Sequence, residues 1–367
     1  MRIDAYEPVR ASNPPSSRQT LQPSAMLPSI DRRHFIARAA WGVSAAGLIG
    51  GWSGTMSAQS PTRRPTVIGA APGVEAVPGR IGFDLPETHR WRIGLNLRTG
   101  SSLRNVTATF PIPVAWPEQE VRVVTKNVDP GVAGWTTRVA PGGTTQVLLR
   151  MPKVAASTNV TAMFEFDVTK SRIVAPEKVD DLVVPVRPSR EVKIFLGTSP
   201  EIDTTHRLIR EAYQEVTAEP HENAWSMVEG LYDHVRDNVR YVNGAIQKAS
   251  DALKSGQGDC EEMTSLVVAL CRNAKIPARM VWVPEHCYPE FYLADGEGNG
   301  HWFPAQAAGT RQFGGIEEYR PILQKGDRFR VPEKGGKPQR YLTEFFTCEV
   351  KGKVDPAPEF VLERVAV

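Results

Sequence analysis

One of the four cysteines in the sequence, Cys260, lies where a thiol can act as a nucleophile. Gly256 and Gly258 precede it and allow a tight turn at little steric cost, and Asp259 is the expected cap of the helix that follows. In the first turn of a helix, unpaired backbone N–H groups and the helix dipole favour an anion, so they lower the pKa of a thiol. The pattern predicts a reactive thiolate at Cys260, with a buried structural cysteine as the alternative.

A cysteine nucleophile needs a base, and His286 is the candidate. It lies at the start of a predicted strand, in which alternation places His286, Tyr288 and Glu290 on one face and Cys287 on the other. If this strand lies beside the start of the Cys260 helix, the imidazole can take the thiol proton and return it to a leaving amine. A histidine on a strand can also be a hydrogen-bonded structural residue, and the residues alone leave both interpretations open.

Two nearby acidic residues and the other cysteines bear on this prediction. Glu261 and Glu262 oppose a thiolate, although side chains of a first helical turn can point into solvent. Cys271, eleven residues after Cys260, lies about 16 Å along the same helix among apolar residues, which predicts a buried, inert thiol. The spacing of Cys and His matches no zinc site, so we expect no metal and no other cofactor.

The disulfide state is the second open question for Cys260. If Cys260 must stay reduced, at most one internal bridge can form among the three remaining cysteines, and the sequence does not identify the partners. A disulfide at Cys260 itself is the alternative, and it would exclude this thiol as the resting nucleophile.

The elements that must position these residues occupy the second half of the chain. Steps of three and four between apolar residues predict helices over "TTHRLIREAYQEV", after Pro220 and over Lys248–Lys254, followed by the Cys260 helix. The segments "ARMVWVPE", "HCYPEFYLAD" and "GHWFPAQ" then predict three strands, with "DGEGNG" as a hairpin turn. Helices followed by antiparallel strands indicate an α+β domain, which we place at residues 201–350.

A different pattern precedes this domain. Apolar and polar residues alternate over 91–98, 106–112, 147–151 and 160–168, which is typical of strands with one buried face. Turn clusters such as "DPGVAG" and "APGGTT" separate them. We therefore predict a β-sandwich-like domain over 86–200 without convergent polar residues, whose role is spacing or substrate presentation.

The N-terminal segment predicts export. "SIDRRHFIARAAWGVSAAGLIGG" contains paired arginines before a weakly apolar stretch, and "MSA" at Met56–Ala58 is a small-residue cleavage site, so residues 1–58 resemble a twin-arginine signal. An uncleaved anchor is the alternative, and Met26 is an alternative start. Residues 59–85 are predicted to be a linker and 351–367 a C-terminal tail. We expect a periplasmic or secreted protein with no stable membrane span after cleavage.

Composition and charge exclude some functions. The chain has 367 residues, of which 41% are hydrophobic and 23% charged, as in an ordinary globular protein of two domains. Its formal net charge of +3 belongs to residues 1–58, which hold six arginines and three acidic residues, so the remainder is formally neutral. We therefore expect no nucleic-acid partner. The oligomeric state is left open.

The segments "GQGDCEEMTSLVVALCRNAKIPARMV", "HCYPEFYL" and "HWFPAQ" together resemble the transglutaminase-like superfamily. That family is marked by Gly-x-Cys at a helix start, a "GIPAR"-like turn, a His-x-(Trp/Tyr)-x-Glu strand and a "GWxPxD" strand. The resemblance covers roughly residues 225–310 and implies a papain-like core that forms a thioester acyl-enzyme from an amide. It also implies that Cys260 is the nucleophile and His286 the base, and β domains ahead of this core are familiar in its exported bacterial members.

The third position departs from the family pattern. Where "GWxPxD" has an acid, this sequence reads "HWFPAQ", so Gln306 takes the place of the third catalytic residue. An acid there would orient His286 and stabilise its imidazolium. The Gln amide oxygen can accept the same N–H bond without charge, and papain-like enzymes use an amide, Asn, in the matching role.

We therefore expect an exported cysteine enzyme that acts on peptide or side-chain amides of a peptide or protein substrate. Water as the second substrate would make it a protease or amidase, and a lysine amine would make it a crosslinking transglutaminase. Hydrolysis is favoured, since the sequence contains no sign of an amine site. The alternative is a catalytically inactive transglutaminase-like module for binding or scaffolding, and Gln306 is its main support.

Overall fold

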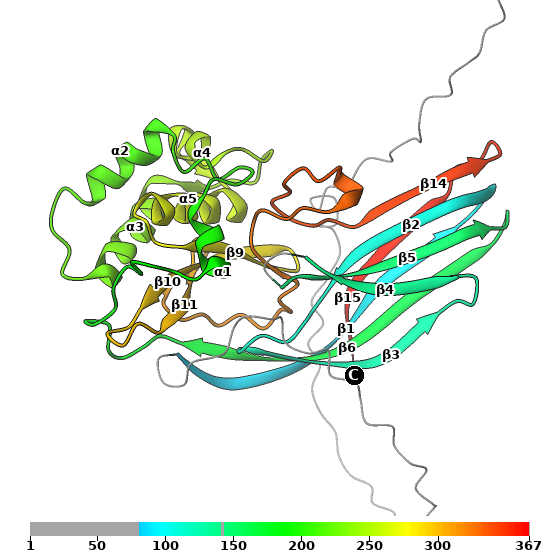
Figure 1. Cartoon of the computed structure of the whole chain (residues 1–367), viewed down its shortest axis with the longest axis horizontal. Helices are drawn as coiled ribbons and strands as arrows, with labels where there is room; N and C mark the ends of the chain where they lie inside the picture. Colours follow the sequence, from blue (N-terminus) through cyan, green and yellow to red (C-terminus); the bar gives the residue numbers. More distant parts are fainter. Residues whose placement is uncertain (1–80, 141–142, 367) are drawn as a thin grey trace, which may run out of the picture.

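The computed structural model describes residues 81–140 and 143–366. Figure 1 shows two domains side by side, the long strands of a β domain on one side and the helices of an α+β domain on the other. The predicted export signal over 1–58 and most of the predicted linker over 59–85 lie outside the described residues. Within the described ranges, no helix has the length and apolar character that a membrane crossing requires.

The β domain is a sandwich of two four-stranded sheets, in the orders β15-β1-β6-β3 and β14-β2-β5-β4. Every pairing within the two sheets is antiparallel. The fold predicted from the alternating pattern is thus confirmed. Its strands are β1 (Gly82–Arg98), β2 (Ser102–Ile112), β3 (Gln119–Val128), β4 (Gly134–Val139), β5 (Thr145–Val154), β6 (Asn159–Val174), β14 (Phe345–Lys351) and β15 (Ala357–Val365).

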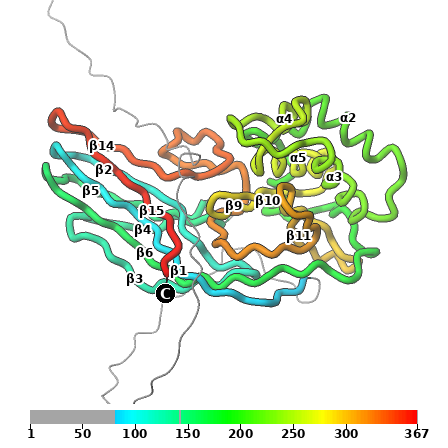
Figure 2. The backbone as a smooth tube through the Cα atoms, turned by 180° about the vertical axis from the view of Figure 1, so that it is seen from behind, coloured from blue at the N-terminus to red at the C-terminus, as the bar shows by residue number. Residues whose placement is uncertain are grey.

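Two strands of the sandwich come from the C-terminal end of the chain. The expected tail over 351–367 is instead largely β15, which pairs along β1 with Phe360 opposite Leu95. β14 likewise leaves the domain predicted over 201–350 and pairs with β2. Phe360 and Leu362 alternate with Glu359 and Glu363, and the apolar pair packs against the sandwich core. The α+β domain is therefore inserted between β6 and β14, and Figure 2 shows β14 and β15 running among the other sandwich strands.

The α+β domain combines helices with a five-stranded antiparallel sheet of order β12-β11-β10-β9-β13. The helices are α1 (Arg190–Lys193), α2 (Arg207–Val216), α3 (Ala224–Asn238), α4 (Ala249–Ser255) and α5 (Cys260–Asn273), with short 3-10 turns η2 (Ile194–Leu196) and η3 (Pro332–Lys334). The sheet strands are β9 (Ala278–Val283), β10 (His286–Ala294), β11 (Gly300–Gln306), β12 (Gln312–Phe313) and β13 (Gln324–Lys325). Two further short strands, β7 (Arg240–Tyr241) and β8 (Gln257–Gly258), pair in parallel.

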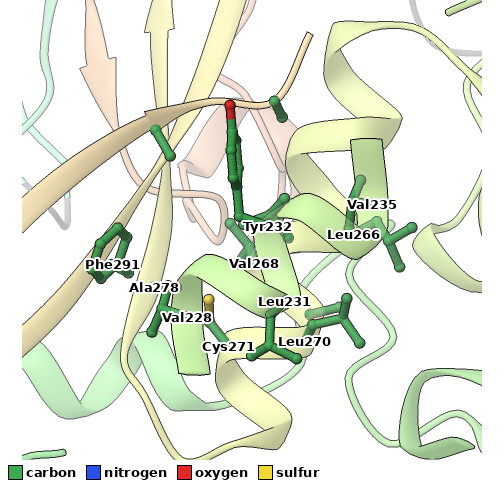
Figure 3. Close-up of a cluster of buried hydrophobic side chains, with 14 of the residues drawn as sticks. Val228, Leu231, Tyr232, Val235, Leu266, Val268, Leu270, Cys271, Ala278 and Phe291 are labelled. Carbon is green, nitrogen blue, oxygen red and sulfur yellow. The ribbon is translucent and has the colours of Figure 1, made fainter. Parts of the chain in front are cut away.

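Helix α5 is the centre of this domain. Its residues Met263–Arg272 are all buried, between α3 on one side and strands β9 and β10 on the other. Figure 3 shows side chains of α3 and α5 meeting in one cluster, together with Ala278 and Phe291 of the sheet. Cys271 lies inside this cluster with 0% of its surface exposed, and burial raises the pKa of its thiol to about 12. The prediction that Cys271 is buried is confirmed, and the raised pKa disfavours a thiolate there.

Buried polar groups cross the boundary between the two domains. Lys325 of β13 donates hydrogen bonds from Nζ to Glu118 Oε1 of the sandwich domain at 2.6 Å and to Glu290 Oε1 of β10 at 2.7 Å. The amide of Gln119 exchanges two hydrogen bonds with the backbone of Ile322. The prediction that the β domain has no convergent polar residues is therefore wrong at this boundary. These contacts and an apolar cluster around Trp116 and Tyr288 attach the sandwich to the sheet that carries His286.

Candidate active site

The start of α5 places Cys260 at a capped helix N-terminus. Asp259 is the N-cap, as predicted, and its side chain accepts a hydrogen bond from the Glu261 backbone N–H at 2.8 Å. Glu262 completes a capping box by accepting from the Asp259 N–H at 2.9 Å, so its side chain turns into the protein and is only 2% exposed. The Glu262 side chain therefore does not point into solvent. Gly256 has a left-handed φ of 63°, which supplies the tight turn before the cap.

Strand β10 begins directly beside the start of α5. The Cys287 Sγ lies 3.4 Å from the backbone carbonyl oxygen of Cys260, and Thr264 Oγ1 donates to the Cys287 carbonyl oxygen at 3.3 Å. These two bonds hold the first turn of the helix against the first residues of the strand. The condition on which the pairing of Cys260 with His286 depended is thus met.

His286 connects the nucleophile with Gln306. Its Nε2 lies 2.8 Å from Gln306 Oε1, and because an amide oxygen only accepts, this nitrogen carries the hydrogen. The same ring interacts with the thiol of Cys260, and this interaction lowers the pKa of Cys260 and raises the pKa of His286. The structure therefore brings together all three predicted site residues, Cys260, His286 and Gln306.

Side chains of helix α3 bind the backbone of Gln306. The Tyr232 hydroxyl donates to the backbone carbonyl oxygen of Gln306 at 2.7 Å, and Arg236 Nη1 donates to the same oxygen at 3.2 Å. Tyr232 is fully buried, so this end of β11 is anchored to the helical core rather than free to move. The amide side chain is thereby presented toward His286 from a fixed backbone.

Electrostatics favour a thiolate on Cys260. The hydrogen bond from Cys287 lowers the pKa of Cys260, burial opposes it, and the hydrogen bond and charge of His286 lower it further, to about 5. Burial disfavours the imidazolium of His286, but its bonds with Cys260 and Gln306 and the charge of the thiolate raise the pKa of His286 above its ordinary value. Both shifts favour transfer of the Cys260 proton to His286, which gives a thiolate–imidazolium pair.

The other residues on the predicted His286 face serve the fold. Glu290 does not face the thiol: it is 2% exposed and binds Arg279 Nε at 2.7 Å as well as Lys325. Tyr288 is fully buried toward the sandwich domain, and its hydroxyl has no hydrogen-bond partner. β10 thus contributes His286 to the site at its first residue and structural contacts along the rest.

The hairpin after β10 forms a separate pair. Asp295 accepts from His301 Nε2 at 3.2 Å, away from His286, so Asp295 does not replace the missing acid. His301 is only 5% exposed. Its burial follows from the pairing of β10 and β11, where His301 lies opposite Leu293.

Three residues near the site were not predicted from the sequence. Cys287 contacts Cys260 although strand alternation assigned it to the opposite face from His286. Tyr241 on β7 pairs with Gly258, two residues before the thiol, and partial desolvation and the charge of Cys260 raise the pKa of this exposed tyrosine. The guanidinium of Arg320 and Cys260 also influence one another electrostatically. Within the described ranges, no cluster of three or more His, Cys, Asp or Glu residues could hold a metal ion.

The fold places a cysteine at the start of a helix beside a histidine on the neighbouring strand, and this arrangement defines a class of proteins with a cysteine nucleophile. Comparison with known proteins indicates the family. Residues 210–307, which include Cys260, His286 and Gln306, match the model of the transglutaminase-like superfamily. The α+β domain of this chain therefore contains a transglutaminase-like core, as the sequence motifs suggested. No curated protein matches the chain.

Two solved structures resemble the chain at low identity. A proposed cysteine protease from Cytophaga hutchinsonii is 17% identical with a TM-score of 0.48, and the match covers 78% of this chain and 93% of that one. A proposed protease from Parabacteroides distasonis is 15% identical with a TM-score of 0.25, and the match covers 63% of this chain and 48% of that one. The chain thus spans about half the length of the second protein.

Proposed function

We propose that the protein is a cysteine hydrolase of amide bonds, a peptidase or amidase that works through a thioester on Cys260. The observation that carries this proposal is the single imidazole of His286, which joins the Cys260 thiol on one side and Gln306 Oε1, at 2.8 Å, on the other. The family supports a cysteine enzyme, and the hydrolytic outcome is the further step proposed here.

The proposed amide hydrolysis follows from the pairing of Cys260 with His286. The Cys260 thiolate attacks the amide carbonyl carbon, a C–S bond forms, and the carbonyl oxygen takes the negative charge beside the N-terminal N–H groups of α5. His286 gives its proton to the leaving amine as the C–N bond breaks, which leaves a thioester. The neutral imidazole then takes a proton from water, the hydroxide attacks the thioester, and the acid and the Cys260 thiolate are released. Gln306 keeps the ring oriented throughout.

One observation favours a second candidate, an inactive binding module. Gln306 accepts a hydrogen bond as an acid would, but it brings no negative charge to balance the imidazolium. Under this second proposal, Cys260→Ala would leave the protein's function intact. Under the first, the same substitution abolishes amide turnover.

The test of the first proposal is the pH dependence of Cys260 alkylation by iodoacetamide, mapped to the Cys260 peptide by mass spectrometry. Cys271 and Cys287 are both fully buried, so labelling at Cys260 can be followed without competition from them. We expect an apparent pKa of about 5, which rises when His286 is replaced by Ala. A pKa near the ordinary value of about 8.5 that ignores the His286→Ala change would overturn the proposal.

We also propose that the protein is exported by the twin-arginine route to the periplasm or beyond. Support comes from Arg32 and Arg33 ahead of the weakly apolar segment, which lies outside the described residues. In a native-like host, the double change Arg32→Lys and Arg33→Lys should trap the precursor inside the cell, as seen by fractionation and immunoblotting. Arg2→Lys is the matched control. Normal export of the double variant would contradict this route.

A further inference from the structure

Two free thiols meet at the catalytic end of α5. Cys260 and Cys287 are both unpaired in the structure. The Cys287 thiol donates to the Cys260 carbonyl oxygen at 3.4 Å, and it lies close enough to the Cys260 sulfur to lower the pKa of that thiol. The two side chains come from different elements, the first residue of α5 and the second residue of β10, and these are held together by the Thr264 bond to the Cys287 carbonyl at 3.3 Å. The contact is therefore fixed by the fold.

The two thiols differ in their exposure to solvent. Cys260 is partly exposed, whereas Cys287 is 0% exposed. The remaining cysteines cannot replace Cys287, because Cys271 is buried about three turns further along α5 and Cys348 lies on β14 of the sandwich. A small oxidant from solvent thus reaches Cys260, and Cys287 is the thiol in position to react with the product.

We propose that Cys260 and Cys287 form a peroxide-responsive pair, in which oxidised Cys260 is captured by Cys287 as an intramolecular disulfide that blocks the nucleophile reversibly. The inference rests on the proposed function, since it assigns a regulatory modification to the same nucleophile. The oxidant is a hydroperoxide, hydrogen peroxide in the simplest case.

The atoms balance in two steps. The Cys260 thiolate attacks a peroxide oxygen, so an S–O bond forms and the O–O bond breaks; sulfur is oxidised, the peroxide is reduced, and the leaving hydroxide takes a proton from His286 to become water. The Cys287 sulfur then attacks the sulfenic sulfur of Cys260. An S–S bond forms, the S–O bond breaks, and the hydroxide leaves with the Cys287 proton as a second water.

Burial gives Cys287 the character that this role requires. Burial and the neighbouring Cys260 raise the pKa of Cys287 well above its ordinary value, so in the resting enzyme it is a protonated thiol without access to solvent. Its S–H donates to the Cys260 backbone carbonyl oxygen at 3.4 Å, and as a protonated thiol it does not compete with the Cys260 thiolate for substrate. Without Cys287, a sulfenic acid on Cys260 is exposed to a second peroxide and proceeds to sulfinic acid, which thiol reductants do not reverse.

The test treats the purified, reduced protein with hydrogen peroxide and maps its cysteine peptides by mass spectrometry without reduction. We expect a Cys260–Cys287 disulfide, a fall of about tenfold or more in the rate of Cys260 alkylation, and full recovery with dithiothreitol. Cys287→Ser keeps the size and a hydrogen-bond donor at this position, and in this variant peroxide should drive Cys260 to sulfinic acid with no recovery. Cys348→Ser is the control and should behave as the wild type.

The outcomes separate the two proposals. If Cys260 alkylates rapidly but peroxide yields sulfinic acid and no disulfide in the wild type, the pair is overturned and the proposed hydrolase stands. If Cys260 is slow toward both iodoacetamide and peroxide, both proposals fall. The wild-type peptide map alone decides the pair, so the result does not depend on whether Cys287→Ser folds.

Discussion

At the residue scale, the site depends on how His286 is held between two partners. The Gln306 amide accepts from Nε2 at 2.8 Å, and the Cys260 thiolate takes the other side of the ring. An amide fixes the tautomer and orientation of the imidazole but adds no charge that would stabilise the imidazolium. In this chain the thiolate itself supplies that charge, because the Cys287 and His286 hydrogen bonds keep it ionised.

A substitution series at Gln306 separates orientation from charge. Gln306→Ala removes the acceptor and should lower kcat/KM on an amide substrate by about 10²-fold, because a loosely held imidazole rarely meets the thiol correctly. Gln306→Glu keeps the length and adds a negative charge, which stabilises the imidazolium and raises the pKa of His286. Since activity requires the imidazolium to donate a proton, the alkaline limb of the pH–kcat/KM profile should move to higher pH.

The measurement for this series is the full pH–rate profile of each variant, with Gln312→Glu as a matched control on the adjoining strand β12. An alkaline limb in Gln306→Glu that stays at the wild-type position would contradict the role given to Gln306. So would wild-type activity in Gln306→Ala.

The sequence was sufficient to predict that Cys260, His286 and Gln306 lie together, since each lies in a motif or at a helix start. It was not sufficient to predict Cys287 as a neighbour of the thiol. Strand alternation separates Cys287 from His286, but α5 lies against β10 at its first residues, where both side chains reach the helix start. That contact depends on the packing of a helix on a strand, which local spacing does not contain.

At the element scale, the first turn of α5 carries an acidic capping box beside a thiolate. Glu262 accepts from the Asp259 N–H at 2.9 Å and from the Gln247 N–H at 3.1 Å, so it ties the loop before α4 to the helix start. Burial raises the pKa of Glu262 to about 7, and the neighbouring Asp259 adds to this, against the effect of the two backbone bonds. The capping carboxyl group of Glu262 thus titrates in a pH range in which most carboxyl groups are already ionised.

Stability should reflect this carboxyl group. A glutamate whose pKa is about 4.3 in the unfolded chain and about 7 in the folded one binds more protons when folded, so its contribution to the free energy of unfolding falls as pH rises between those values. Glu262→Gln removes the titrating group. Urea denaturation of both proteins at pH 5 and pH 8 should show the variant gaining stability relative to the wild type at the higher pH.

Asp251→Asn, on the exposed side of α4, is the control and should show no such trend. A constant difference between Glu262→Gln and the wild type across this pH range would mean that the folded and unfolded pKa values of Glu262 are alike, and the prediction would be wrong.

At the element scale, helices and strands could be predicted where one face of the element is apolar and packs against the core. The helix over Lys248–Lys254 and the three strands after the Cys260 helix appear within one or two residues of their expected bounds. β15 was expected to be a tail, because it follows the charged segment 349–355 and nothing in the sequence shows that β1 offers an open edge. A strand that completes a distant sheet is determined by its partner, and the partner lies over 250 residues earlier.

At the whole-molecule scale, the insertion of the α+β domain into the sandwich makes the domains mutually dependent. The chain leaves the sandwich after β6 and returns through β14, so both connections lie at the boundary where Lys325 meets Glu118 and Glu290. Glu118 and Lys325 are 207 residues apart in sequence. A buried charge network of this kind cannot be predicted from spacing, because only the packing of the two domains brings its members together.

The network can be tested at its central carboxylate. Arg279 and Lys325 both bind Glu290, and the side chains of all three are less than 5% exposed. Glu290→Gln leaves two buried cations with one anion, Glu118, so the free energy of unfolding at pH 7 should fall by about 3–5 kcal/mol. Burial would raise the pKa of Glu290, but the two cations outweigh it and lower the pKa, so in the wild type this contribution is present above about pH 4.5 and is lost as pH falls through the lowered value.

Urea denaturation at pH 7 and pH 4 measures both parts of this prediction. Arg311→Ala is the matched control: it removes an ion pair to Glu229 and Asp233 whose side chains are 36–47% exposed, and it should cost less than about 1 kcal/mol. Because Glu290 lies on the strand that begins with His286, Glu290→Gln should also lower the rate of Cys260 alkylation, while Arg311→Ala should not. If Glu290→Gln unfolds at the wild-type urea concentration and keeps the wild-type alkylation rate, the sandwich does not stabilise the catalytic strand through this network.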